Sequence, residues 1–175
     1  MGFKNPPDQH CAECPSFNKE ARKRRLSSPQ HQRSILIKKI DDAVSLVVRI
    51  RGNWTCIKCH TRYPPVISRR TGLPAQNLMT SSHYFGRGKM GTRWELEDLD
   101  PMDIFCHQKV ENAKKEDVEG FNYEQYMIQK IGVERLELLR IKSEMYAGYS
   151  IADLLLIQAD WQRILRETMA QYEYH

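Results

Sequence analysis

The sequence predicts an α+β fold that is helical over most of its length. Apolar residues recur at helical spacing in residues 31–52 and again in residues 120–175. The segment between them, residues 53–119, instead holds short strand-like stretches, glycine-containing turns and three of the five cysteines. A small core of strands and one helix, flanked by further helices, accounts for these observations.

The composition is that of a globular chain with one ordinary domain or a small domain with extensions. Of the 175 residues, 41% are hydrophobic and 28% are charged, which argues against a disordered or fibrous protein. No apolar run approaches the roughly 18 residues of a membrane span, so we expect no membrane partner. Residues 1–7 lack the apolar stretch of a signal peptide, so we expect a cytoplasmic protein with reduced cysteines.

The two halves of the chain differ strongly in charge. Residues 1–93 hold 18 Lys and Arg against 5 Asp and Glu, whereas residues 94–175 hold 9 against 17. Lysines and arginines that neutralise phosphates release counterions, which drives non-specific affinity for nucleic acid. The basic half therefore predicts a nucleic-acid partner; alternatively, the two halves attract each other across a solvated surface.

Residues 1–30 are expected to form an irregular basic arm, because four prolines interrupt them. Its positive charge is concentrated in one cluster: Arg22, Lys23, Arg24 and Arg25. The segment 31–52 follows as a helix that ends at Gly52. Its apolar face is formed by Leu36, Ile40, Val44, Val47 and Ile50.

Residues 53–119 are expected to form the core. Two strands are predicted, over residues 77–84 and 93–96, with a glycine-containing loop between them. Asp103 suits the N-cap of a helix that reaches Ala113. Residues 120–175 form a C-terminal helical region, in which Ser150 to Asp153 resembles a capping box at the start of a last helix.

Cysteine spacing predicts one structural zinc site. Cys56 and Cys59 stand three residues apart, which lets two thiolates grip one Zn²⁺. About 45 residues later Cys106 offers a third ligand, and Asp103 stands where a fourth cysteine would be. The alternative is that Cys106 is only a small buried apolar residue.

A second pair, Cys11 and Cys14, lies in the basic arm beside His10. Together with His31 or His60 it offers ligands for a second zinc. Since the arm supplies no other ligand, the alternative that we favour is a weakly structured segment.

Two histidines bracket the predicted strands. His83 ends the first strand, and His107 follows Cys106 into the helix. This arrangement resembles the ββα-metal fold of HNH nucleases. In that fold the first histidine is a general base, the second binds a catalytic divalent ion, and the zinc site holds the elements together.

More narrowly, residues 54–142 resemble the NinG/Rap family of phage recombination endonucleases. The family pattern is found here as Cys56/Cys59, Ser82-His83-Tyr84-x-x-Arg87, Thr92-Arg93-Trp94-Glu95, Asp98 and Asp103-x-x-Cys106-His107. The segment Lys130–Arg135 resembles a helix junction of the family. Two departures matter, because Asp98 replaces an asparagine of the family pattern and Asp103 replaces its third cysteine.

The resemblance implies a metal-dependent endonuclease that hydrolyses phosphodiester bonds in branched DNA such as Holliday junctions. His83 is then the general base, and His107 holds Mg²⁺ or Mn²⁺. Asp98 either helps to bind that ion or orients the loop that carries the base. Arg87 and Arg93 clamp phosphates, unless they are ordinary surface arginines. The residues expected to bind DNA are Arg22, Lys23, Arg24, Arg25, Arg69, Arg70, Arg87, Lys89 and Arg93.

Two other functions stay open. The departures at Asp98 and Asp103 allow a zinc-stabilised DNA-binding or scaffolding protein with an inactive HNH site. An RNA-directed nuclease is the third possibility. The C-terminal helices offer apolar faces for a homodimer, with packing onto the small ββα unit as the alternative. If the chain is phage-encoded, its compartment is the cytoplasm of the host cell.

Overall fold

The computed structural model describes residues 28–67, 69, 78–113, 117–145 and 148–172. The predicted cluster Arg22–Arg25, the pair Cys11 and Cys14, and Arg70 lie outside this part. The elements in chain order are α2 (Pro29–Arg51), β1 (Met79–His83), the 3-10 helix η1 (Leu96–Asp98), β2 (Leu99–Asp103), α3 (Ile104–Asn112), α4 (Tyr123–Ile131), α5 (Val133–Glu144) and α6 (Ile151–Tyr172). The protein is therefore α+β and mostly helical, as the sequence predicts.

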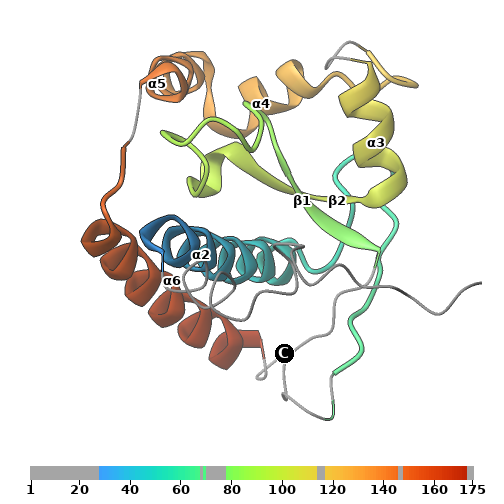
Figure 1. The fold of residues 1–175 in the computed structure, drawn as a ribbon. Helices are drawn as coiled ribbons and strands as arrows, with labels where there is room; N and C mark the ends of the chain where they lie inside the picture. The colour runs from blue at the N-terminus through green and yellow to red at the C-terminus, as the bar shows by residue number, and fades with distance from the viewer. Residues whose placement is uncertain (1–27, 68, 70–77, 114–116, 146–147, 173–175) are drawn as a thin grey trace, which may run out of the picture.

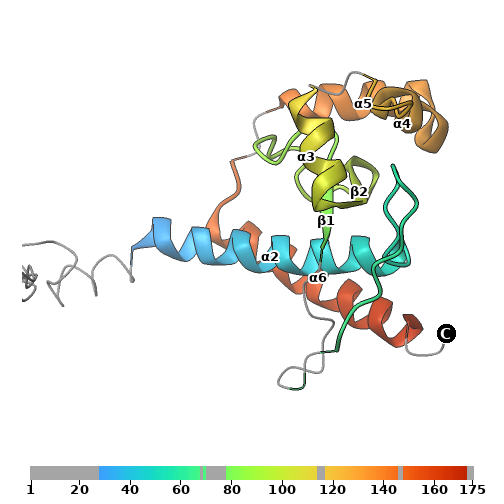
Figure 2. The same cartoon turned by 90° about the vertical axis from the view of Figure 1, so that its right-hand side faces the viewer.

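These elements form three layers (Figures 1 and 2). Helices α2 and α6 lie side by side, the hairpin β1–β2 with α3 lies over α2, and α4 and α5 lie on the far side of the hairpin. The hairpin therefore lies between two helical layers, and α3 packs against its strands. Within the described residues no helix is long and apolar enough to cross a membrane.

Helix α2 is the base of the fold. Ser28 is its N-cap and accepts a hydrogen bond from the backbone amide of His31, and Pro29 opens the first turn. Its predicted apolar face is buried, and α6 packs against it with Leu154, Trp161 and Leu165. Each such side chain contributes about 1.5–3 kcal/mol on full burial.

The first predicted strand is confirmed as β1, but the second is wrong. The backbone of residues 92–95 turns, with the amide of Glu95 donating to the carbonyl of Thr92. The second strand is β2, which pairs antiparallel with β1 so that His83 lies opposite Leu99. This strand was not predicted because it contains Pro101, and proline argues against a central strand. In a sheet of two strands both strands are edges, where proline is tolerated.

Helix α6 uses one apolar face within the chain, whereas α5 leaves Val133, Leu138 and Ile141 exposed. The buried face of α6 covers α2, and Ser150 and Asp153 cap α6 reciprocally as predicted. Helices α4 and α5 meet at Gly132, whose φ of 81° suits a residue without a side chain. On α6, Leu155 and Leu156 stay exposed. Packing within the chain thus occupies one face of α6, and the homodimer stays a prediction.

Candidate metal centre and candidate active site

The four predicted zinc ligands come together. Ligand atoms of Cys56, Cys59, Asp103 and Cys106 all lie within 4.8 Å of one another. The turn after α2 supplies the first two, and the end of β2 with the first turn of α3 supplies the others. Zn–S bonds of about 2.3 Å place two sulfurs of a tetrahedral site about 3.8 Å apart, so the cluster is of the right size for one zinc ion.

Asp103 serves this cluster and helix α3 at once. One carboxylate oxygen accepts hydrogen bonds from the backbone amides of Phe105 and Cys106, at 2.9 and 3.0 Å. The other oxygen lies 3.2 Å from the sulfur of Cys59. The N-cap of α3 and the candidate metal ligand are therefore the same side chain.

The pKa values of three of the four groups are shifted by burial and by hydrogen bonds within the cluster. Burial raises the pKa of Cys106, and the hydrogen bond to Asp103 raises it further. Burial also raises the pKa of Cys56. Burial alone would raise the pKa of Asp103, but hydrogen bonds from the Cys106 thiol and amide and from the other two thiols lower it. A metal that replaces these thiol protons gives the carboxylate a new positive partner.

Two ion pairs to Glu119 lie beside this site. Lys58, between the two cysteines of the turn, contacts Glu119 at 2.8 Å, and Lys109 of α3 contacts the same carboxylate at 2.6 Å. Hydrogen bonds from Lys109 and Lys58 lower the pKa of Glu119 to about 2. The turn of Cys56 and Cys59 is thus tied to α3 on its outer side as well.

His83 ends strand β1 with its ring fixed. Its Nε2 lies 3.2 Å from the backbone carbonyl of Arg93. A carbonyl oxygen only accepts, so Nε2 carries the proton and Nδ1 keeps the lone pair. Burial lowers the pKa of His83 to about 4, partly offset by that hydrogen bond. With this pKa the imidazole is neutral at pH 7 and can accept a proton at Nδ1, but it is a weaker base than one whose pKa lies near the working pH.

Asp98 braces the chain that follows His83. Its side chain is fully buried, and one carboxylate oxygen accepts a hydrogen bond from the amide of Phe85 at 2.9 Å. Its backbone carbonyl accepts from the amide of Tyr84 at 2.9 Å. Of the two roles predicted for Asp98, these contacts favour the orienting one.

His107 packs on strand β1 and faces a carboxylate. Its Nδ1 lies 3.1 Å from the hydroxyl of Thr80, which itself donates to the carbonyl of Met102. The hydroxyl proton is thus engaged, so Nδ1 donates to the oxygen. In the neutral ring Nε2 then presents a lone pair toward Glu111, 3.3 Å away. A lone pair and a carboxylate repel unless a proton or a metal ion lies between them.

Among the described residues, one group brings three or more metal-binding side chains close together, the cluster of Cys56, Cys59, Asp103 and Cys106. His83, Asp98 and His107 do not form a second one. Glu111 was missed by the sequence interpretation, although its position four residues after His107 puts both on one helix face.

The predicted phosphate-binding residues differ in availability. Arg93 is largely buried and binds both carboxylate oxygens of Asp41, at 3.0 and 2.8 Å. Arg87 is 65% exposed and makes one contact of 3.2 Å to the same carboxylate. Lys89 pairs with Glu144 at 2.8 Å, and Arg69 is exposed. Arg87 is therefore the better placed of the two arginines to meet a phosphate.

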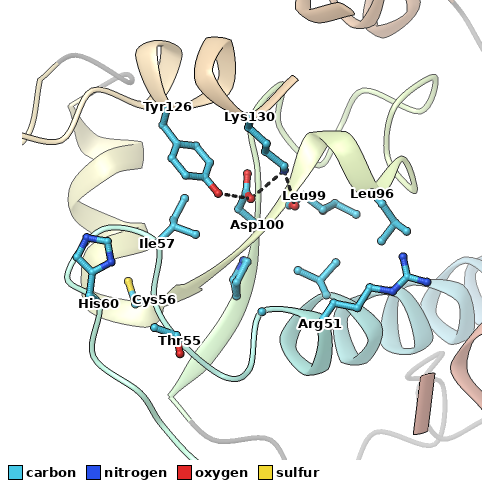
Figure 3. A pocket seen from close by; sticks show the side chains of 13 residues that line it. Arg51, Thr55, Cys56, Ile57, His60, Leu96, Leu99, Asp100, Tyr126 and Lys130 are labelled. Atoms are coloured by element: carbon cyan, nitrogen blue, oxygen red, sulfur yellow. Dashed lines mark hydrogen bonds and ion pairs between the residues drawn. The ribbon is translucent and has the colours of Figure 1, made fainter. Parts of the chain in front are cut away.

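A cavity of about 440 Å³ lies behind the candidate metal centre, between the end of α2, the cysteine turn and α4 (Figure 3). The carboxylate of Asp100 points into it and is held by the Tyr126 hydroxyl at 3.0 Å and by Lys130 at 2.8 Å. Burial raises the pKa of Asp100 despite Lys130. Of the four residues in the candidate metal centre, Cys56 alone lines this cavity.

Comparisons with protein-family models, curated proteins and solved structures found no match to this chain. The class that the structure defines is an α+β, mostly helical protein with a Cys₃Asp cluster suited to a metal ion such as zinc.

Proposed function

We propose that the protein is a metal-dependent endonuclease with an HNH-like ββα site that hydrolyses phosphodiester bonds in DNA. One observation carries this proposal: His83 Nε2 lies 3.2 Å from the Arg93 carbonyl, which can only accept, so Nδ1 at the end of strand β1 keeps the lone pair that a base uses. The order β1, β2, α3, with candidate zinc ligands at the junction of the last two, supports it.

In this proposal His83 takes a proton from the attacking water at Nδ1. A positioned base of this kind contributes typically 10²- to 10⁴-fold to the rate. Asp98 keeps the segment after His83 in place through the amide of Phe85. Since one oxygen of the Asp98 carboxylate is used in this way, we assign it to positioning rather than to metal binding.

His107 and Glu111 are our proposed protein ligands for the catalytic ion. Nε2 of His107 and the Glu111 carboxylate, 3.3 Å apart, would hold the ion, and an imidazole with a carboxylate suits Mn²⁺ as well as Mg²⁺. Such an ion supplies charge neutralisation at the scissile phosphate and at the leaving oxygen. A zinc ion held by Cys56, Cys59, Asp103 and Cys106 would keep α3, and with it His107, at a fixed place beside β1.

The choice of DNA rests on charge and on resemblance. The basic half of the chain and the exposed guanidinium of Arg87 suit a phosphate backbone. The motifs shared with the NinG/Rap family favour branched recombination intermediates over plain duplex.

The test is a cleavage assay with labelled four-way junction, duplex, single-stranded DNA and RNA, each with Mg²⁺, Mn²⁺ or EDTA. We expect metal-dependent cutting of DNA, strongest on the junction, that is lost in EDTA and in His83→Ala. If RNA is the only substrate that is cleaved, the proposed substrate class is RNA and not DNA.

A second function is favoured by one specific observation: His83, Asp98 and His107 do not form a metal-ligand cluster in the described residues. It is a zinc-stabilised DNA-binding or scaffolding protein with an inactive HNH site. Tight binding to junctions without cutting in either metal supports this function and overturns the enzyme.

A further inference from the structure

We infer that Asp41 of helix α2 is a positioning residue for the general base His83, acting through Arg93. This inference rests on the proposed function and adds to it an element from outside the residues that resemble HNH nucleases. Helix α2 would then be part of the active-site support, not only the base of the hydrophobic core.

The contacts of Asp41 all lead to the loop that follows His83. Its carboxylate accepts from the guanidinium of Arg93 through two nitrogens, at 3.0 and 2.8 Å. It also accepts from the indole of Trp94 at 2.9 Å and from Arg87 at 3.2 Å. A carboxylate that is only 9% exposed thus gathers three side chains of one loop against α2.

Arg93 passes this restraint on to His83. Its guanidinium is fixed by Asp41 and by a further hydrogen bond of 2.6 Å to the carbonyl of Arg87. Its own backbone carbonyl is the acceptor for His83 Nε2 at 3.2 Å. Holding the side chain of Arg93 therefore holds the group that sets the tautomer and the direction of the imidazole.

The part of the loop around Gly86 and Gly88 has little packing of its own, whereas the later part of the loop is held against α5 by Gly91, Lys89 and Glu95. Gly86 has a φ of 89°, and added side chains at the first two glycines would meet nothing within 4 Å. Glycine of this kind leaves the backbone many conformations. The turn at Thr92 to Glu95 and the buried Trp94 also hold this segment, and the bidentate pair between Asp41 and Arg93 adds the restraint on the Arg93 side chain that comes from α2.

The matched variants are Asp41→Ala and Asp42→Ala. Asp42 is the next residue of the same helix, but its carboxylate is exposed and pairs with Lys38 one turn away. The first readout is the Nε2 proton of His83 by NMR at pH 7, which is protected from solvent exchange while it donates to the carbonyl. The second is kcat and KM for cleavage of a four-way junction with Mn²⁺.

In Asp41→Ala we expect loss of the protected Nε2 proton and a fall in kcat of about 10- to 100-fold, the cost of a displaced catalytic group, with KM within about twofold. Asp42→Ala should match wild type in both. Arg93→Lys keeps the charge and the backbone carbonyl but loses the bidentate geometry, so it should resemble Asp41→Ala. If Asp41→Ala loses its zinc or its helical content, the same two measurements on Arg93→Lys replace those on Asp41→Ala.

A protected Nε2 proton and wild-type kcat in both Asp41→Ala and Arg93→Lys overturn the inference. So does a rise in KM with kcat unchanged, which assigns Asp41 to substrate binding. If the wild type cuts no substrate, the proposed function fails by itself, and the exchange of the Nε2 proton still decides whether Asp41 orients the ring.

Discussion

Asp103 places one carboxylate oxygen 3.2 Å from the sulfur of Cys59 and uses the other to cap helix α3. A cysteine at this position could bind zinc but would cap the helix less well, because a carboxylate near a helix N-terminus is favoured by the helix dipole. An aspartate at this position can therefore cap α3 and at the same time offer a ligand to the candidate metal centre.

The first prediction concerns zinc. We expect one Zn²⁺ per chain by elemental analysis, and Cys56→Ser should lose it and lower the thermal unfolding temperature, because structural zinc contributes folding free energy. Asp103→Cys should tighten zinc in competition with a chelator. Asp103→Ala should loosen zinc and also cost about 1 kcal/mol of stability through removal of the N-cap.

Asp160→Ala, on the exposed side of α6, is the control and should keep full zinc and stability. Wild-type protein that contains no zinc when purified without a chelator would contradict this metal centre.

The second prediction concerns the general base. His83→Ala should leave zinc content and DNA binding unchanged but lower the cleavage rate by about 10²- to 10⁴-fold. His107→Ala should also lower cleavage, but excess Mn²⁺ should restore part of it, because that variant weakens the ion site rather than the base. Equal rescue of both variants by Mn²⁺ contradicts the two roles.

The third prediction concerns pH. The pKa of His83 falls from its ordinary 6.5 to about 4 because the ring is buried. Between these values the unfolded chain binds a proton that the folded chain excludes, so stability must fall as the pH falls from 6.5 to 4. Urea unfolding of wild type and His83→Gln at pH 7.5, 6 and 5 measures this.

His83→Gln keeps an amide that can donate to the Arg93 carbonyl but has no titrating ring. The stability difference between the two proteins should therefore shift in favour of His83→Gln as the pH is lowered. A difference that stays constant over this range means that the ring titrates normally in the folded state.

The fourth prediction concerns Asp98. Asp98→Asn keeps a side-chain oxygen to accept from the amide of Phe85, so cleavage should be maintained or raised. The requirement for Mn²⁺ should not change. If instead activity falls and more Mn²⁺ is needed, Asp98 is a ligand of the catalytic ion and its positioning role is wrong.

The fifth prediction concerns the basic arm. Replacing Arg22, Lys23, Arg24 and Arg25 by alanine should weaken binding to all DNA sequences alike. The slope of log K against log salt should shrink by roughly 0.9 for each phosphate that the arm no longer neutralises. Arg163→Ala, in the acidic half, should leave the slope unchanged. An unchanged slope in the arm variant means that these residues do not contact phosphate.

The sequence by itself determined the features that depend on short-range patterns. The helical spacing of Leu36, Ile40 and Val44 predicted α2, and the pair Ser150 and Asp153 predicted the start of α6. Cysteine spacing, with Asp103 three residues before Cys106, predicted the ligand cluster. These features depend on periodicity, capping or chelate spacing, which few neighbouring residues decide.

Only the tertiary structure decided how the candidate active site is supported. The strand expected at residues 93–96 is absent, because Arg93 and Trp94 bind Asp41 of α2 instead of a neighbouring strand. Arg93, predicted to clamp phosphate, makes a structural contact with Asp41, and its contact with phosphate stays a prediction. About fifty residues separate Asp41 from this loop, and a pairing over that separation is set by the packing of whole elements, which no local pattern records.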